Sequence, residues 1–161
     1  MNQEYLQSVL NYDELTGLFT WKINSAKTKK NAVAGGFTPN GYHRIRINTK
    51  RYLSHRLAWL YVYGYFPEKL IDHINGNPSD NRIKNLRLAT NAENCCNAKL
   101  YKNNISGIKG VNWHNKKRKW RAYIKDNGKL KHLGMFDDFF EACCVACSYR
   151  NKLHKEFSRI I

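Results

Sequence analysis

The sequence predicts an α+β protein made of two small domains. Short segments of alternating apolar and polar residues are interspersed with short helical patterns, and no internal repeat is present. A polar stretch at 99–106 separates two such groups of elements. A chain of 161 residues is long enough for either one domain or two small ones. We therefore predict domains at 1–98 and 107–161, joined by a linker at 99–106.

The first domain is predicted to mix short strands with three helices. Ser54 is the expected N-cap of the second helix, and Gly64 is expected to end it. Thr90 and Glu93 match a capping box, which predicts a further helix directly after residue 90. In order, the elements expected before residue 90 are a helix at 3–10, strands at 19–23, 42–47 and 51–53, a helix at 55–63, and strands at 69–74 and 86–88.

The second domain is predicted to be a three-stranded antiparallel sheet packed on one helix. Strands are expected at 109–114, 118–125 and 129–133, and the helix begins near Asp138. In the central strand, alternation sends Trp120, Ala122 and Ile124 to one face and Arg121, Tyr123 and Lys125 to the other. The first face is apolar and suits the helix, whereas the second is basic with one aromatic ring.

The net charge of +16 is the strongest signal in the composition. An excess this large on a short chain indicates a polyanionic partner, and nucleic acid is the leading candidate because bound phosphates release counterions. An anionic membrane surface is the weaker interpretation, since no basic helix has a clean apolar face. In the strand at 42–47, Arg44 and Arg46 share one face, which is expected to contact DNA.

The five cysteines and the N-terminus indicate a reducing compartment. An odd cysteine count favours free thiols, and the Cys144–Cys147 pair lacks a second ligand pair at zinc spacing, so no structural zinc is expected. The first residues lack the pattern of a signal peptide, and no apolar run is long enough to cross a bilayer. A cytoplasmic protein is the expectation.

Asp72 and His73 are the leading candidates for chemistry. Cutting a phosphodiester requires a base that activates water and a cation that stabilises the phosphate and the leaving oxygen. A neutral imidazole near pH 7 is such a base, and carboxylate and amide oxygens are hard ligands for Mg²⁺ or Mn²⁺. A strand, a loop, a strand and a helix are expected to bring Asp72 and His73 next to Asn94. Adjacent strand residues point to opposite faces, so sharing a site requires the strand to end or distort there.

The spacing of Asp72-His73, Asn85-Leu86 and Glu93-Asn94 resembles the HNH endonucleases, in particular the phage and intron-associated H-N-N variety. The resemblance covers most of 19–97. It implies a ββα-metal nuclease domain in which His73 is the general base. It also implies that Asp72 and Asn94 bind one divalent cation, Mg²⁺ or Mn²⁺, and that Asn85 holds the loop that orients His73.

Two other interpretations of these residues remain open. The same residues occur as ordinary loop and cap residues, although the full spacing argues against this. His55 lies at the first turn of a helix, where a capping or packing role competes with a role in the active site.

Residues 106–157 resemble the Apetala-type (ethylene-response-factor) DNA-binding domain, on Ser106-Gly107-Ile108, Lys119-Trp120-Arg121 and Leu133-Gly134-Met135-Phe136. The resemblance implies a three-stranded sheet that lies in the major groove with a helix behind it. The positions that it directs towards DNA are Asn112, His114, Lys116, Arg121, Tyr123 and Lys125.

These expectations combine into a phage homing-type DNA endonuclease whose C-terminal domain tethers it to double-stranded DNA. The rival interpretations are a DNA-binding regulator with an inactive nuclease fold and a nuclease that acts on RNA or structured DNA. A monomer and a dimer both remain open, as do nicking and double-strand cleavage.

Overall fold

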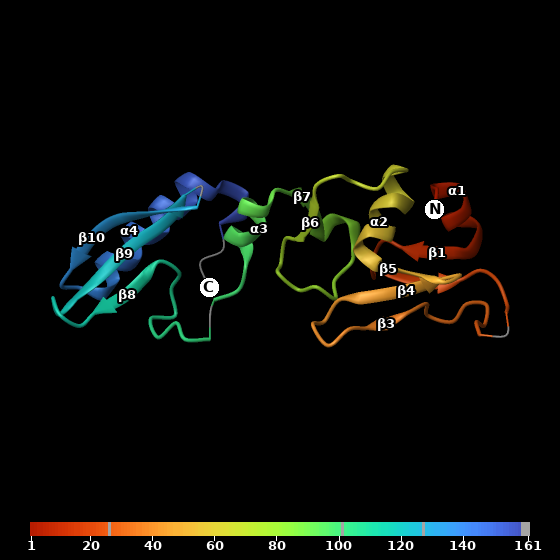
Figure 1. The fold of residues 1–161 in the computed structure, drawn as a ribbon, viewed down its shortest axis with the longest axis horizontal. Helices are drawn as coiled ribbons and strands as arrows, with labels where there is room; N and C mark the ends of the chain where they lie inside the picture. Colours follow the sequence, from red (N-terminus) through yellow and green to blue (C-terminus); the bar gives the residue numbers. More distant parts are fainter. Residues whose placement is uncertain (26, 101, 127, 159–161) are drawn as a thin grey trace. The chain divides into compact units, whose positions relative to one another are not determined.

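The computed structural model describes residues 1–25, 27–100, 102–126 and 128–158, and it has mixed α+β architecture with small antiparallel sheets (Figure 1). Contacts divide the chain into two compact units, Met1–Ala89 and Thr90–Ile161. No helix in the described ranges has the length and apolar character needed to cross a bilayer.

Among the described residues, the first unit has three small antiparallel sheets, each of two or three strands. It also has two α-helices and one short 3-10 helix. Helix α1 leads directly into the β1–β2 hairpin, while β4 is the central strand of the β3-β4-β5 sheet and β6 pairs with β7. The bounds are α1 (Gln3–Val9), β1 (Leu10–Asp13), β2 (Leu18–Trp21), β3 (Gly36–Phe37), β4 (His43–Ile47), β5 (Lys50–Leu53), α2 (Ser54–Tyr63), β6 (Leu70–His73), η1 (Ile83–Asn85) and β7 (Leu86–Ala89).

One apolar core holds these elements together. Leu6, Phe19, Ile45 and Leu57 come from α1, β2, β4 and α2, and all four are fully buried. Alternation in β4 places Ile45 and Ile47 inside and leaves Arg44 and Arg46 exposed, as the sequence predicts.

The predicted cap of α2 is wrong. Ser54 is the first residue of the helix, Leu53 occupies the N-cap position, and no side chain caps it. The Ser54 hydroxyl instead lies 2.7 Å from Nδ1 of buried His43 in β4, so it satisfies an imidazole rather than the helix end. At the other end, Gly64 has φ of +84° and ends α2 in the left-handed conformation, as predicted.

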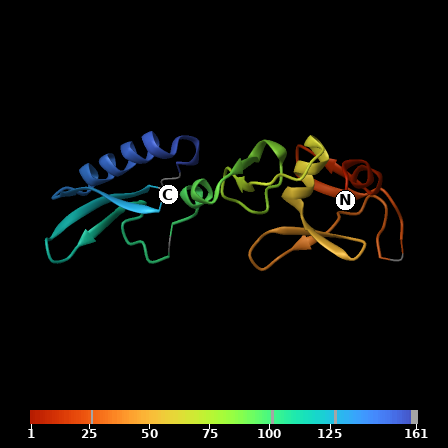
Figure 2. The ribbon, with the colours of Figure 1, turned by 45° about the horizontal axis from the view of Figure 1, so that its top comes forward.

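The second unit has the predicted sheet and helix. The strand order is β10-β9-β8, and α4 lies along one face of this sheet, as Figure 2 shows. Ala122, Ala142 and Ala146 form the centre of its core. The bounds are α3 (Asn91–Asn97), β8 (Val111–His114), β9 (Lys119–Asp126), β10 (Lys129–Phe136), α4 (Phe139–His154) and η2 (Lys155–Phe157).

The structural division falls before α3, whereas the sequence analysis assigns α3 to the first domain. Helix α3 packs against η2 of the second unit, which accounts for the difference. The capping box that starts α3 is confirmed, because the Thr90 hydroxyl accepts from Glu93 N and the Glu93 carboxylate accepts from Thr90 N. The functional domains at 1–98 and 107–161 stay predictions, and residue 101 of the predicted linker lies outside the described residues.

Candidate active site

The β6–β7 hairpin positions the residues proposed for chemistry in the first unit. Asp72 lies opposite Arg87 and His73 lies opposite Leu86, and β6 ends at His73. The chain then turns through a polar loop and the short helix η1 before it returns as β7. Because the strand ends here, His73 is placed at the junction between a strand and a loop.

Asn85 ties the two ends of this loop together. Its Oδ1 accepts from the backbone N–H of Asn75 at 3.0 Å, and its Nδ2 donates to the carbonyl of Asp80 at 2.8 Å and to Oδ1 of Asn75 at 3.1 Å. Asp80 in turn forms an ion pair with Arg82, which holds the pKa of the Asp80 carboxyl near 2. Asn85 is 7% exposed, so these bonds form largely away from water.

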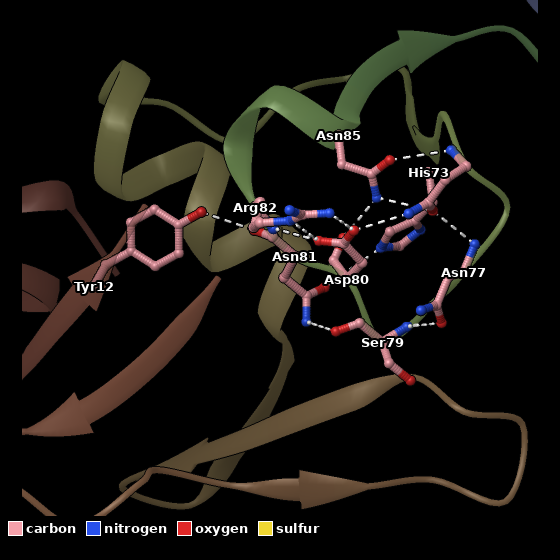
Figure 3. Close-up of polar contacts among 9 residues, drawn as sticks. Tyr12, His73, Asn77, Ser79, Asp80, Asn81, Arg82 and Asn85 are labelled. Carbon is pink, nitrogen blue, oxygen red and sulfur yellow. Dashed lines mark hydrogen bonds and ion pairs between the residues drawn. The ribbon is translucent and has the colours of Figure 1, made fainter. Parts of the chain in front are cut away.

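Asn81 is the residue that contacts the imidazole of His73. The distance from Asn81 Oδ1 to His73 Nε2 is 3.4 Å (Figure 3). The Asn81 amide nitrogen donates to the Ser79 carbonyl at 3.2 Å, and this bond orients Oδ1 towards the ring. Nε2 of His73 is therefore the protonated nitrogen, and Nδ1 carries the lone pair.

The β1–β2 hairpin contacts the backbone of Asn81 and of the residue that follows it. The hydroxyl of Tyr12 in β1 donates to the Asn81 carbonyl at 2.8 Å (Figure 3). Gly17, in the β1–β2 turn, has φ of +74°, and a Cβ there would lie 2.5 Å from Arg82 N. Glycine is therefore required at this turn, because only its bare backbone fits against the loop.

A second histidine packs against His73. The His55 ring lies edge-to-face on the His73 ring, with 5.1 Å between centroids, and Tyr42 lies beside both. His55 is 6% exposed, and its Nδ1 has no hydrogen-bond partner among the described residues. The ring faces His73 instead of capping the start of α2.

Burial keeps both imidazoles neutral. It lowers the pKa of His73, although the bond to Asn81 and the charges of Asp72 and Asp80 act in the opposite direction. Burial, together with His73 and Arg56, lowers the pKa of His55 to about 3. At neutral pH the His73 ring can therefore accept a proton.

Asp72 is paired with Arg87 across the hairpin. Its Oδ2 accepts a hydrogen bond from Arg87 Nε at 2.9 Å and also lies 2.9 Å from Nη2, so a single carboxylate oxygen faces both nitrogens of the ion pair. Both side chains are largely buried. Asp72 therefore pairs with Arg87, while His73 contacts Asn81 and His55, as expected for adjacent strand residues.

The other predicted site residues lie on several elements. Asn94 is exposed on α3 in the second unit, and its pairing with Asp72 stays a prediction. Arg44 and Arg46 lie on the exposed face of β4, where Arg46 is directly opposite Arg51 of β5. Two guanidiniums facing each other are unfavourable unless an anion lies between them.

The six predicted DNA contacts of the second unit lie along the sheet. Arg121 donates to Asn112 Oδ1 at 3.0 Å and lies over the Tyr123 ring, so these three form one continuous surface. His114 ends β8 and lies opposite Lys119, while Lys116 and Lys125 are exposed at the turn and near the end of β9. This face is opposite the one covered by α4, because Ala122 and Ile124 are buried and alternate with it.

Asn81 and Arg87 are contacts that the predicted site lacks, whereas the sequence leaves a role for His55 open. Pairing the two expected strands in register would have found Arg87, since it falls opposite Asp72. Nothing in the sequence separates Asn81 from the other asparagines of its loop, and its contact with His73 depends on how the loop folds back.

A family model described as HNH endonuclease matches residues 52–95. Protein 3.8 of Escherichia phage T7 is 37% identical over 106 residues, which cover 65% of this chain and 87% of that protein. The chain belongs to the HNH endonuclease family.

Two further proteins are similar to this chain. The SPbeta prophage-derived putative HNH homing endonuclease YosQ of Bacillus subtilis is 36% identical over 67 residues, which cover 38% of this chain and 39% of YosQ. A solved structure that is described as showing DNA binding and cleavage by the HNH homing endonuclease I-HmuI is also similar. The alignment covers 96% of this chain and 90% of the I-HmuI chain. That alignment has a TM-score of 0.46 and 21% identity.

Proposed function

We propose that this chain hydrolyses phosphodiester bonds of double-stranded DNA with His73 as the general base. The observation that carries the proposal is the environment of His73. Its ring is buried at the end of β6, its Nε2 faces the Asn81 amide oxygen, and its pKa is lowered. An imidazole held neutral in one tautomer is what a general base requires.

The proposed reaction uses one water molecule. Nδ1 of His73 takes a proton from the water as its oxygen attacks the phosphorus atom. The P–O bond to the leaving oxygen breaks, and that oxygen takes a proton from solvent. A positioned general base contributes roughly 10²–10⁴-fold to such a rate.

Asp72 and Asn94 are the proposed ligands of one divalent cation, Mg²⁺ or Mn²⁺. The donor set fits, since one carboxylate and one amide oxygen are hard ligands, and no soft ligand is part of it. A cation held there supplies positive charge for the phosphate and the leaving oxygen. Arg87, which holds Asp72 Oδ2, keeps that carboxylate oriented.

The order of elements supports a ββα-metal nuclease domain. The hairpin β6–β7 is followed in the chain by helix α3, which carries Asn94. Asn85 holds the loop between the two strands through both of its amide atoms. This bonding supports the role of Asn85 as the residue that keeps His73 in place.

Two basic surfaces are the proposed contacts with DNA. Arg44 and Arg46 form one on β4, and the open face of the β8–β10 sheet, which includes Arg121, forms the other. We propose that the second unit is an Apetala-type DNA-binding domain, because it has the three strands, the covering helix and the basic open face of that family. The name of the relative YosQ supports a homing setting.

Cleavage of supercoiled plasmid tests the proposal. Wild type is incubated with Mg²⁺, with Mn²⁺ and with EDTA, beside His73→Ala. We expect metal-dependent nicking or linearisation that falls by at least about 100-fold in the variant, while DNA affinity stays within a few-fold. Leu15→Ala truncates a side chain that is 81% exposed in the β1–β2 turn and serves as the control, which keeps its turnover.

The result that would overturn the proposal is cleavage by His73→Ala at the wild-type rate. Intact DNA binding without cleavage under either metal would favour the inactive regulator instead. Competition by RNA at equal concentration separates a DNA nuclease from one with another substrate.

A further inference from the structure

A cavity of about 1030 Å³ lies within the second unit, apart from the residues proposed for chemistry. Helix α3, strand β9, helix α4 and η2 contribute its walls. Leu100, Leu153 and Phe157 give it apolar surface, and Arg150 lines it as the most buried cation. This combination of apolar wall and buried charge is typical of a ligand site.

Among the described residues, no carboxylate forms an ion pair with Arg150. Arg150 is 8% exposed, and its Nε has no hydrogen-bond partner among the described residues. The groups that act on its charge are the thiols of Cys96 and Cys147 and the Tyr123 hydroxyl, and no carboxylate is among them. Burial accordingly lowers the pKa of Arg150. A buried guanidinium is costly unless an anion pairs with it.

The fold makes room for this guanidinium. Gly110 has φ of +80°, and a Cβ there would lie 2.3 Å from the Tyr123 carbonyl and 3.4 Å from Arg150 Nη2. The backbone N–H of Tyr123 donates to the Gly110 carbonyl at 2.8 Å, which fixes the glycine against the sheet. A side chain at position 110 would therefore disturb the place where the guanidinium lies.

Other charges around the cavity favour a dianion over a single carboxylate. Lys99, Lys125 and Lys155 line it, and the Lys109 ammonium donates to the Cys96 and Ala98 carbonyls at its wall. The carboxylates that also line it are Glu93, Asp126 and Glu156, and Glu93 is committed to the capping box of α3.

We propose that this cavity is a binding site for a phosphate group on a body of nucleotide size, with Arg150 as the anchor. The planar guanidinium matches the geometry of phosphate oxygens, the lysines add positive charge, and the apolar wall accepts a flat ring. The phosphate comes either from a free nucleotide or from a nucleotide of bound DNA. The site does not depend on phosphodiester cleavage.

The test follows the Nε–H signal of Arg150 by ¹⁵N NMR and the melting temperature, with the full chain. The probes are inorganic phosphate, deoxyadenosine 5′-monophosphate and deoxyadenosine. We expect the two phosphates to shift the Arg150 signal in a saturable way and to raise Tm, with the monophosphate binding more tightly. Deoxyadenosine is expected to do neither.

Two substitutions and a control separate binding from folding. Arg150→Met is expected to lose the rise in Tm, and Arg150→Lys to bind the monophosphate about tenfold more weakly because it offers a point charge. Arg118→Met removes an exposed arginine of the same unit and is expected to respond as wild type. Should Arg150→Met fail to fold, Arg150→Lys still tests the anchor.

An Arg150 signal that ignores both phosphates overturns the proposal, as does undiminished binding by a folded Arg150→Met. A 12-base-pair duplex distinguishes the two sources. Displacement of the bound monophosphate by the duplex identifies a DNA nucleotide as the occupant, and simultaneous binding identifies a free one; both outcomes support the site.

Discussion

Asn81 shows how much the orientation of a single amide decides at this site. Its nitrogen is committed to the Ser79 carbonyl, so its oxygen faces Nε2 of His73. Its own carbonyl accepts from Tyr12, which fixes the backbone from the opposite side. The tautomer of the proposed base therefore depends on a residue outside the family's name-giving motif.

Two variants, Asn81→Asp and Asn81→Leu, test separately how charge and a hydrogen-bond acceptor at position 81 affect His73. The aspartate keeps an acceptor for Nε2–H and adds a negative charge, which raises the pKa of His73, so the acid limb of the pH–rate profile moves to higher pH. The leucine removes the acceptor, and we expect kcat to fall by about 10–100-fold, as for other residues that orient a reacting group. Plasmid nicking between pH 5 and 9 measures both effects, and an unmoved limb in Asn81→Asp would count against the contact.

His55 should make the first unit sensitive to acid. Its pKa is about 3 in the folded chain, against about 6.5 when unfolded. The stability that comes from keeping it neutral is complete above pH 6.5, and it is lost as the pH falls from about 6.5 towards 3. The burial of His43 and His73 acts in the same direction.

His55→Phe keeps a ring against His73 but cannot be protonated. We expect the free energy of unfolding of wild type, relative to this variant, to decrease on the order of a few kcal/mol between pH 7 and pH 4. Urea unfolding at several pH values measures it, with His132→Phe as the exposed control. Parallel pH dependence in wild type and His55→Phe would show that His55 is not the group responsible.

At the scale of elements, the sequence predicts what periodicity and capping control. The strands β4, β5, β6 and β7 lie within a few residues of their predicted positions, and the Thr90 capping box starts α3 as expected. Two strands escape such prediction: β1 follows α1 without a break, and β3 has only two residues. Strand β1 does alternate between buried and exposed residues, but the helical pattern expected at 3–10 runs directly into it, whereas β3 is too short to display alternation.

The candidate site likewise combines residues that local spacing predicts with contacts that only long-range packing creates. Asp72, His73 and Asn85 can be predicted as site residues because their spacing is a local property of the chain. Contacts with Asn81 and His55 join residues through the folding of a loop and the docking of α2, which no local pattern records. Long-range packing decides them.

Gly17 tests whether the β1–β2 hairpin supports the loop after β6. A Cβ would lie 2.5 Å from Arg82 N and 2.7 Å from the Asn81 carbonyl carbon, at a φ that alanine rarely adopts. We expect Gly17→Ala to destabilise the chain by roughly 1–3 kcal/mol and to slow nicking beyond what lost stability explains. Gly128→Ala also has positive φ, but it meets no atom within 4 Å and controls for backbone strain alone. Equal activity of the two variants would exclude the support.

At the scale of the whole molecule, charge is spread over both units. A net charge of +16 is carried by a chain in which only three ion pairs are seen among the described residues. Most of its lysines and arginines are thus available to a polyanion. Affinity for DNA should then fall steeply with salt, because each neutralised phosphate releases counterions.

Arg44 and Arg121 test whether both units contribute to that affinity. The plot of log K against log salt should lose roughly 0.9 of its slope for each phosphate contact removed. We expect Arg44→Ala and Arg121→Ala each to flatten it by about this amount, and the double variant to show the sum, since the two side chains share no partner. Lys152→Ala, on the helix behind the sheet, controls for lost charge and should leave the slope nearly unchanged.

If only Arg121→Ala alters the slope, the second unit alone binds the backbone and the surface of β4 is not a DNA contact. If each does, both units bind DNA in the same complex, which is how a tethering domain raises the local concentration of a nuclease at its target.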